Sequence, residues 1–185
     1  MTGVRKGRGR DRSPLLFAVI RDKLEAAKFL LEQGAISDGY IGLAVSVEMM
    51  DLLLLYGDNI NGGTRYDYAA HFYVTKGRKD LLSRAISAGL DTTNRGIQRG
   101  LFRDCREHHD MIPFLVELGF DINVMESNFP VLMFHLCAEY EFFRQLMLNG
   151  ARFRAVERGG TLDEYVKGYE TANRNLKRLR EEFGY

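Results

Sequence analysis

The stretch Phe29-Leu30-Leu31-Glu32-Gln33-Gly34-Ala35 decides the fold of this chain, because related stretches recur four more times. In each of them an apolar cluster and one or two variable residues are followed by a glycine. The other copies are Leu53–Asp58, Ala85–Leu90, Phe114–Phe120 and Leu146–Ala151. Successive glycines are separated by 23, 32, 30 and 31 residues, so three of the four spacings lie near one period. A fixed period of about 20 to 50 residues indicates a repeat protein.

The glycines of these five stretches are predicted to end helices. The apolar residues before each glycine are spaced as on one face of a helix. Glycine adopts the positive φ that ends a helix without the steric cost that a side chain brings. After the glycine the chain reads Asp58-Asn59-Ile60-Asn61 in one copy, Asp121-Ile122-Asn123 in another and, less closely, Asp91-Thr92-Thr93-Asn94 in a third. Asp and Asn favour turns, so each helix should lead into a turn.

A further helix should precede each of these runs. Ser13 stands directly before Pro14, and a Ser cap followed by Pro at the first helical position is a helix start signal. Glu25 then opens the next helix, so residues 13–34 hold two short antiparallel helices. A pair of this size cannot bury both of its faces alone, and it therefore has to stack on copies of itself.

These features resemble the ankyrin-repeat family, whose unit reads Thr-Pro-Leu-His-x-Ala, then Gly-His-x-Glu, then Leu-Leu-x-x-Gly-Ala-Asp-x-Asn. The first unit follows that pattern without a gap. Its matching residues are Ser13-Pro14-Leu15, Ala18, Glu25, Leu30-Leu31 and Gly34-Ala35. Later units match at fewer positions, which are His71, Gly77, Asp80, His108, Asp110, Pro130, Glu141 and Gly150-Ala151. The resemblance covers roughly residues 13 to 183.

The resemblance implies an all-α domain over residues 13–185, an ankyrin-type solenoid of about five to six stacked helix-turn-helix repeats. The expected units are 13–38, 39–66, 67–96, 97–127 and 128–158, with a capping unit over 159–183. The last helix carries four bases that resemble a nucleic-acid patch, namely Arg174, Lys177, Arg178 and Arg180. We favour a capping role for them, because a terminal repeat needs a polar outer face.

The second unit departs from the pattern by its length. Ala44 and Gly57 are 13 residues apart, whereas the equivalent Ala18 and Gly34 are 16 apart. We expect the missing residues to come from the segment between the two helices, which would make that turn abnormally tight.

Positive charge is concentrated at the start of the chain. The 26 basic and 25 acidic residues give a net charge of +1, but residues 1–12 alone carry +4 because Asp11 is their only acid. The bases of this segment are Arg5, Lys6, Arg8, Arg10 and Arg12. Glycines are interleaved and no large apolar residue follows Val4, so we expect a disordered arm. Its function would be an electrostatic contact with RNA, DNA or an acidic partner. The alternative is a tail that only aids solubility.

The composition excludes several classes of protein. A chain of 185 residues with 45% hydrophobic and 28% charged residues is typical of one soluble globular domain. Apolar stretches such as Pro14–Ile20 are far too short to span a bilayer, so no membrane association is expected. Two cysteines form no disulfide framework, which favours the reducing cytoplasm. We expect a monomer.

One cluster has the residue types that bind zinc, and it comprises Cys105, His108, His109, Asp110, His135 and Cys137. Its spacing argues against a site, because consecutive residues in the turn at 108–110 point in different directions. No nucleophile has a partner at a suitable spacing either. We therefore predict no metal, no cofactor and no catalytic residue, and we expect that the protein is not an enzyme.

Function should reside on the surface that the stack creates. Ankyrin-like stacks bind other proteins through their loop tips and concave helical face, so the resemblance implies a protein–protein interaction module. A more specific version is an inhibitor or immunity-type protein, and nucleic-acid or ribonucleoprotein binding through the basic arm is the alternative. Tyr and Arg are enriched at interface hot spots. The candidate partner-binding residues at the tips are Tyr40, Arg65, Tyr66, Arg95, Met125, Phe153 and Arg154. Any one of the aromatics could instead pack on its own loop.

Overall fold

The computed structural model describes residues 13–37, 39–62, 69–98, 100–126, 129–130, 139–152 and 170–184 of the chain. The α-helices are α1 (Pro14–Ile20), α2 (Leu24–Glu32), α3 (Val47–Leu55), α4 (Ala69–Thr75), α5 (Lys79–Ser87), α6 (Arg95–Gln98), α7 (Met111–Glu117), α9 (Tyr140–Leu148) and α11 (Glu170–Phe183). Two 3-10 helices are η1 (Tyr40–Leu43) and η2 (Arg103–Glu107). Strands β1 (Met125–Glu126) and β2 (Phe129–Pro130) pair as a short antiparallel ribbon. The expected all-α solenoid is confirmed, with this ribbon as the β-structure of the described part.

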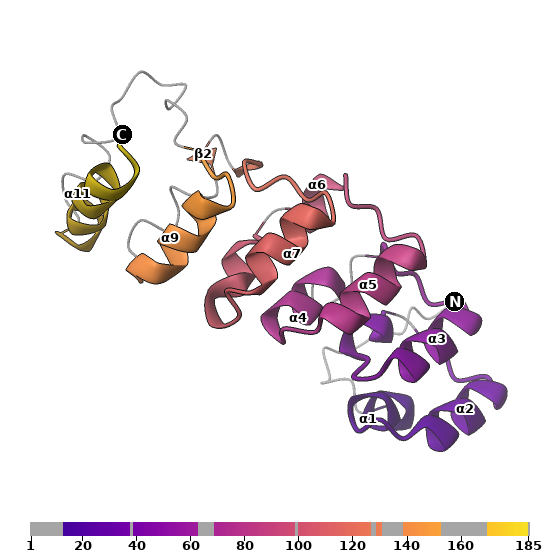
Figure 1. Cartoon of the computed structure of the whole chain (residues 1–185). Helices are drawn as coiled ribbons and strands as arrows, with labels where there is room; N and C mark the ends of the chain where they lie inside the picture. Colours follow the sequence, from indigo (N-terminus) through magenta and orange to yellow (C-terminus); the bar gives the residue numbers. More distant parts are fainter. Residues whose placement is uncertain are drawn as a thin grey trace, which may run out of the picture.

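The helices stack in pairs along one direction, from α1 and α2 at one end to α11 at the other (Figure 1). Within the first pair α1 packs against α2, and α4 packs against α5 in the third. Between pairs, α2 contacts α3, α3 contacts α5, and α4 contacts both η1 and η2. Each pair therefore depends on its nearest neighbours, as in other solenoids. The boundaries between the units stay a prediction.

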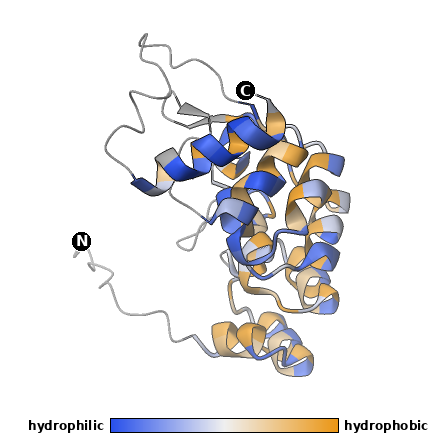
Figure 2. Cartoon of the chain, turned by 60° about the vertical axis from the view of Figure 1, so that its left-hand side comes forward, coloured by the Kyte–Doolittle hydropathy of each residue, from blue (hydrophilic) through white to orange (hydrophobic). Residues whose placement is uncertain are grey.

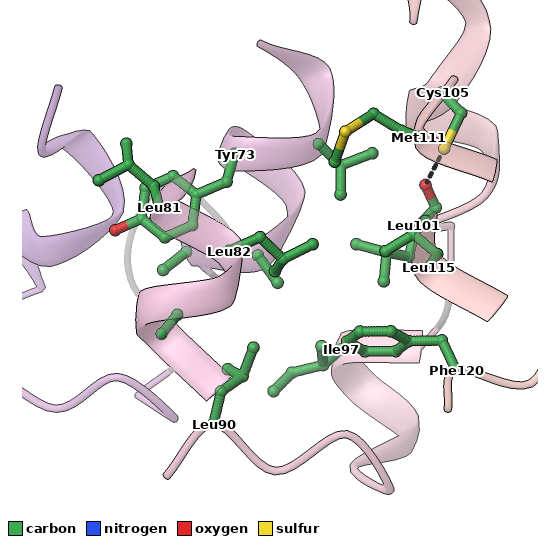
Figure 3. Packing of buried hydrophobic residues seen from close by; sticks show 14 of the residues in the cluster. Tyr73, Leu81, Leu82, Leu90, Ile97, Leu101, Cys105, Met111, Leu115 and Phe120 are labelled. Atoms are coloured by element: carbon green, nitrogen blue, oxygen red, sulfur yellow. Dashed lines mark hydrogen bonds between the residues drawn. The ribbon is translucent and has the colours of Figure 1, made fainter. Parts of the chain in front are cut away.

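The core is a row of apolar side chains that runs between the helix pairs. Figure 3 shows Leu82 of α5 facing Leu101 and Leu115 of the next pair, and all three are fully buried. Tyr73 of α4 is also fully buried, and its hydroxyl donates to the carbonyl of Ile41 in the preceding pair (2.5 Å). Burial raises the pKa of the Tyr73 phenol well above its usual value, so the hydroxyl keeps its proton and remains a donor.

The five predicted helix ends are confirmed. Gly34 N–H donates to the carbonyl of Leu31 (2.9 Å) and Ala35 N–H donates to that of Leu30 (3.0 Å), which together form a Schellman motif. The same two bonds end the helices at Gly57, Gly89, Gly119 and Gly150. All five glycines have φ between +86° and +95°. The residue after the glycine is buried at Leu90, Phe120 and Ala151, so the motif also returns the chain to the core.

The second unit is shortened in its first helix, and the expectation of an abnormally tight turn is wrong. Residues 21–23 separate α1 from α2, and residues 44–46 separate η1 from α3, so the two turns have equal length. The turns 76–78 and 108–110 of the next two pairs also match. The missing residues instead reduce the first helix to the single 3-10 turn η1, because the turn must meet its equivalents in the neighbouring units. Ser46 Oγ, for example, donates to Asp22 Oδ1 of the preceding turn (2.6 Å).

The far end of the stack has a polar outer face. Ala172, Leu176 and Leu179 of α11 are buried, while the four bases Arg174, Lys177, Arg178 and Arg180 are exposed. Figure 2 shows α11 as a largely hydrophilic helix. Glu182 joins α11 to α9, because it accepts hydrogen bonds from the Tyr140 hydroxyl and from Arg144 Nε, both at 2.5 Å. These two bonds lower the pKa of Glu182 and keep it charged. Arg178 also lies over the Tyr140 ring of α9 (3.7 Å to the centroid), and the capping role stays a prediction.

Among the described residues, none of the helices combines the length and the apolar character that a bilayer-spanning helix requires.

Replacing Gly89 by Ala should destabilise the protein by about 1 to 2 kcal/mol, because a side chain is disfavoured at positive φ. The space around this position is open, with no atom within 4 Å of an added Cβ, so the cost comes from the backbone alone. Gly89→Asn should cost less, since Asn tolerates this conformation. Urea unfolding followed by circular dichroism measures the effect. Exposed Ser83→Ala on the same helix is the control, and equal stability of Gly89→Ala and wild type would contradict the argument.

Candidate binding surface

The loops that follow the helix-ending glycines share one internal geometry. Asn59, Asp91 and Asp121 each accept, through a side-chain oxygen, the backbone N–H two residues further on, at 2.8 to 2.9 Å. Such side-chain turns replace a backbone turn at low cost. In two of the loops the next residue, Ile60 or Ile122, is buried and anchors the loop to the core. The expectation of turns after the glycines is confirmed.

Asparagine side chains connect each of two loops to the next one along the stack. Asn61 Nδ2 donates to the carbonyl of Gly89 (2.8 Å), and Asn61 Oδ1 accepts from Asp91 N–H (2.7 Å). Asn123 makes the same two bonds to Gly150 O (3.0 Å) and Arg152 N–H (2.8 Å). Because one amide satisfies a donor and an acceptor of the neighbouring backbone, it fixes the spacing between successive loops. We call this pair of contacts the asparagine ladder.

A buried carboxylate organises the first loop. Asp58 accepts hydrogen bonds from Ser37 Oγ (2.5 Å) and from the backbone N–H groups of Gly39 (3.1 Å), Ile41 (3.0 Å) and Asn59 (2.9 Å). A buried charge is tolerated when it is hydrogen-bonded to this extent. Asp58 therefore ties the loop that leaves α2 to the one that leaves α3.

Of the predicted partner-binding residues, Arg95 is the one whose side chain is described as exposed. It opens the short helix α6, which Asn94 caps by accepting Gly96 N–H (2.8 Å). Met125 begins β1, which follows the loop at 121–124. Both residues directly follow a loop that leaves a second helix, 91–94 before Arg95 and 121–124 before Met125, so both lie at the tip edge of the solenoid. Arg65, Tyr66, Phe153 and Arg154 lie outside the described residues, as do Arg5, Lys6, Arg8, Arg10 and Arg12.

Tyr40 is a core residue, so its prediction as a partner contact is wrong. Its side chain is 6% exposed, and its hydroxyl lies 2.9 Å from Ser13 Oγ of the preceding unit. The error has the same cause as the tight-turn expectation. Residue 40 belongs to the shortened first helix η1, and not to the tip, so it faces the neighbouring helix pair.

Ile36 is an exposed tip residue that the sequence reasoning missed, with 81% of its surface accessible. It lies two positions after Gly34, where the other loops carry the exposed polar residues Asn59, Asp91, Asp121 and Arg152. In the sequence, an apolar residue at a position where the other loops are polar could have identified Ile36. The described tips thus combine one apolar residue with charges of both signs.

Charged and polar pairs also join neighbouring helix pairs along the stack. Lys79 Nζ lies 2.6 Å from Asp110 Oδ2, and this hydrogen bond lowers the pKa of the Asp110 carboxyl. Arg84 reaches Asp51 (2.7 Å). His71, which the resemblance had matched to the family's His, places Nδ1 at 2.5 Å from Asp104 Oδ2. These contacts are largely at the surface and contribute little stability each, but they keep the units in register.

The residues of the suspected metal cluster have other contacts. Cys105 is buried, and its Sγ donates weakly to the carbonyl of Leu101 (3.6 Å; Figure 3). His109 lies beside the ring of Phe142 (5.5 Å between centroids), while Asp110 pairs with Lys79. No group of three or more His, Cys, Asp or Glu side chains among the described residues could hold a metal ion. His135 and Cys137 lie outside that part of the chain.

Replacing Asn61 by Ala should remove both bonds of its rung of the asparagine ladder. We expect a loss of about 1 to 2 kcal/mol in the free energy of unfolding, since each bond contributes about 1 kcal/mol. In amide hydrogen exchange, Asp91 N–H should exchange faster than in wild type. Thr93 N–H donates within its own loop, so it serves as the internal control. Unchanged protection of Asp91 N–H would show that the ladder does not hold the loops.

The thiol of Cys105 should be unreactive in the folded protein, because burial raises its pKa well above the usual value and blocks access. The test uses Cys137→Ser, which leaves Cys105 as the one thiol of the chain. Ellman's reagent at mildly alkaline pH should react only after denaturant is added. Immediate reaction of the folded variant would contradict this burial.

Comparison with known proteins identifies the architecture. No protein-family model matches the sequence, and no curated protein matches it. Among solved structures, the human ASB11 ankyrin repeat domain matches with a TM-score of 0.57 and 17% sequence identity. The match covers 90% of this chain and 98% of that one. A likeness at this identity establishes the fold, and the chain is therefore an ankyrin-type solenoid.

Proposed function

We propose that this chain is a protein-binding module that contacts its partner through the loop tips and the helical face beside them. The observation that carries the proposal is the asparagine ladder, because it holds successive tips at fixed spacing. A row of rigid tips loses little conformational entropy on binding, and solenoids use such extended surfaces for macromolecular partners.

The side chains on the described tips fit a polar protein surface with one apolar pocket. Ile36 would enter that pocket, because an isoleucine with 81% of its surface exposed gains most from burial. Arg95 and Arg152 would pair with acidic groups of the partner, and Asp91 with a base. The bond from the Thr93 hydroxyl lowers the pKa of Asp91, which keeps this acid charged. The predicted contacts of the same surface also include Arg65, Tyr66, Met125, Phe153 and Arg154.

The finer version of the proposal is an inhibitor or immunity-type protein that covers its target in the cytoplasm and performs no catalysis itself. Its support is that the exposed groups of the tips are suited to contact, while the buried Cys105 and the paired Asp110 are already engaged. The alternative function is nucleic-acid binding by the basic arm, which the charge of residues 1–12 favours.

Capture of the partner tests the proposal. The tagged chain would be recovered from its native cells, and co-purifying proteins would be identified by mass spectrometry and produced in pure form. With that partner, Ile36→Asp and Arg95→Glu should each weaken binding at least about tenfold, because truncation or reversal of an interface anchor typically costs more than 1 kcal/mol. The matched control is Ser83→Glu, an exposed change on α5 away from the tips. Equal affinity of both tip variants and wild type would exclude the tip surface.

Deletion of residues 2–12 separates the two functions. Binding to the captured protein should survive the deletion, since it depends on the repeats. Binding to single- or double-stranded nucleic acid, with its steep dependence on salt, should be lost if the arm supplies it. A captured protein that requires residues 2–12 would count against the repeats as the binding surface.

A further inference from the structure

One register of the first helices faces the preceding unit. This register is the residue three positions before the end of the first helix in each unit. Its members are Phe17, Tyr40, Phe72 and Asp104. Tyr40 reaches Ser13 and Asp104 reaches His71, both in the preceding pair. Phe72 is half-buried against the core. Phe17 has no described unit before it and is 47% exposed.

The second helices repeat this pattern. Eight residues before the terminal glycine stand Met49, Leu81, Met111 and Phe142, each at most 1% exposed, and Figure 3 shows Met111 pointing toward the preceding pair. The same register in α2 is Ala26, which is exposed. The residue five positions before the terminal glycine behaves in the same way. In α5 it is Arg84, which reaches Asp51 in α3 of the preceding unit, and in α2 it is Phe29, which is 59% exposed. Leu30, one residue on, is half-buried, while its equivalents in the four later units are buried.

Phe17, Ala26, Phe29 and Leu30 thus form an apolar surface at the α1–α2 end of the stack, which we call the end face. In the later units, the residues at the same positions contact the preceding unit. The end face is therefore made of the side chains that elsewhere form contacts between repeats. Figure 2 shows this end of the molecule as largely hydrophobic, in contrast to the opposite end, where α11 is largely hydrophilic. Terminal repeats require a polar outer face, and an exposed apolar surface of this kind marks a contact site.

Two charged residues lie on the rim of the end face, and the position of the first of them meets the preceding unit in the next three units. Lys23 stands eleven residues before its terminal glycine, as do Ser46, Arg78 and His108 in the next three units. All three of these equivalents reach the preceding turn. Ser46 Oγ donates to Asp22 Oδ1 (2.6 Å), Arg78 Nη1 donates to Val45 O (2.5 Å), and His108 lies against Gly77, 2.8 Å from where a Cβ would be.

Glu25 is the acid of this rim. It stands nine residues before its glycine, as does Asp110, which pairs with Lys79 of the preceding helix. At the same position of two other units the carboxylate pairs inside its own unit, Asp80 with Arg78 and Glu141 with Gln145. At the end face the two rim positions carry one base and one acid, Lys23 and Glu25, both exposed. Lys23 of one copy can pair with Glu25 of another, so the end face is complementary in charge to the end face of a second copy.

We propose that a second copy of this chain docks on the end face and forms a head-to-head dimer with two-fold symmetry. Phe17 and Phe29 of each copy pack against the other, and Lys23 of each pairs with Glu25 of the other. Such isologous contacts are the commonest form of homo-oligomer. Residues 1–12 are unsuited as the occupant, because Met1 and Val4 are their only large apolar residues and five bases accompany them. The proposed dimer differs from the monomer expected from the sequence, and it is independent of the function proposed for the tips.

Sedimentation equilibrium of the full chain over a wide range of concentration tests the proposal. Wild type should move from the monomer mass of 21.2 kDa toward twice that mass as concentration rises. Phe17→Glu with Phe29→Glu should weaken association at least about tenfold, because two aromatic anchors are lost and like charges meet. The control is Leu55→Glu, which changes a residue with 79% exposure on α3, away from the end face, and it should dimerise like wild type. Circular dichroism of each variant verifies that it is folded.

A charge exchange tests the two-fold arrangement without altering the apolar residues. Lys23→Glu and Glu25→Lys should each be monomeric, since each brings like charges together twice. The double exchange should restore the dimer, and mixing the two single variants should give a heterodimer. A wild type that stays monomeric at every concentration, a dimer that survives loss of both phenylalanines, or a dimer that is lost on deletion of residues 2–12 would each overturn the proposal.

Discussion

The left-handed glycine at the end of each second helix is the constraint on which the rest of the structure depends. Its positive φ lets two backbone N–H groups turn back onto the last carbonyls of the helix, and this reverses the chain within two residues. The following residue then enters the core, as at Leu90 and Phe120. Because the loop starts from a fixed point, the side-chain turn recurs at the same distance from the helix in three loops, and the bridging asparagine does so in two of them. Without that fixed point, Asn61 could not meet both Gly89 O and Asp91 N–H.

The same local logic explains what the sequence predicted well. Helix ends at glycines, the Ser13 cap before Pro14 and turns at Asp and Asn depend on a few consecutive residues, and all of them were confirmed. Predictions failed where the answer depends on a neighbouring unit. The deletion in the second unit could shorten either the turn or the helix, and nothing local decides between them. The turn kept its length because Ser46 must reach Asp22 and because Arg78 must reach Val45 O.

Tyr40 and the asparagine ladder illustrate the same limit in the candidate binding surface. Tyr40 was placed at a tip because it lies in the stretch that follows Gly34, but the helix η1 already begins at that residue. Asn61 and Asn123 were recognised as turn residues, yet their amides act on the next unit, about 30 residues away along the chain. Ile36 could have been found by aligning the loops on their glycines and asking which residue broke the polar pattern.

The two ends of the described stack differ in the chemistry of their exposed side chains. A stack of helix pairs gains its stability from contacts between neighbours, and within the described residues the pair at either end has such contacts on one side. At α11 the exposed side chains are mostly charged, and Glu182 is bonded to Tyr140 and Arg144. At α1 and α2 the registers that meet a neighbour keep their apolar chemistry in Phe17, Phe29 and Leu30. An end with apolar contact residues gains stability when a neighbour covers it, and the exposed Lys23 and Glu25 on its rim are the basis on which we propose a second copy as that neighbour.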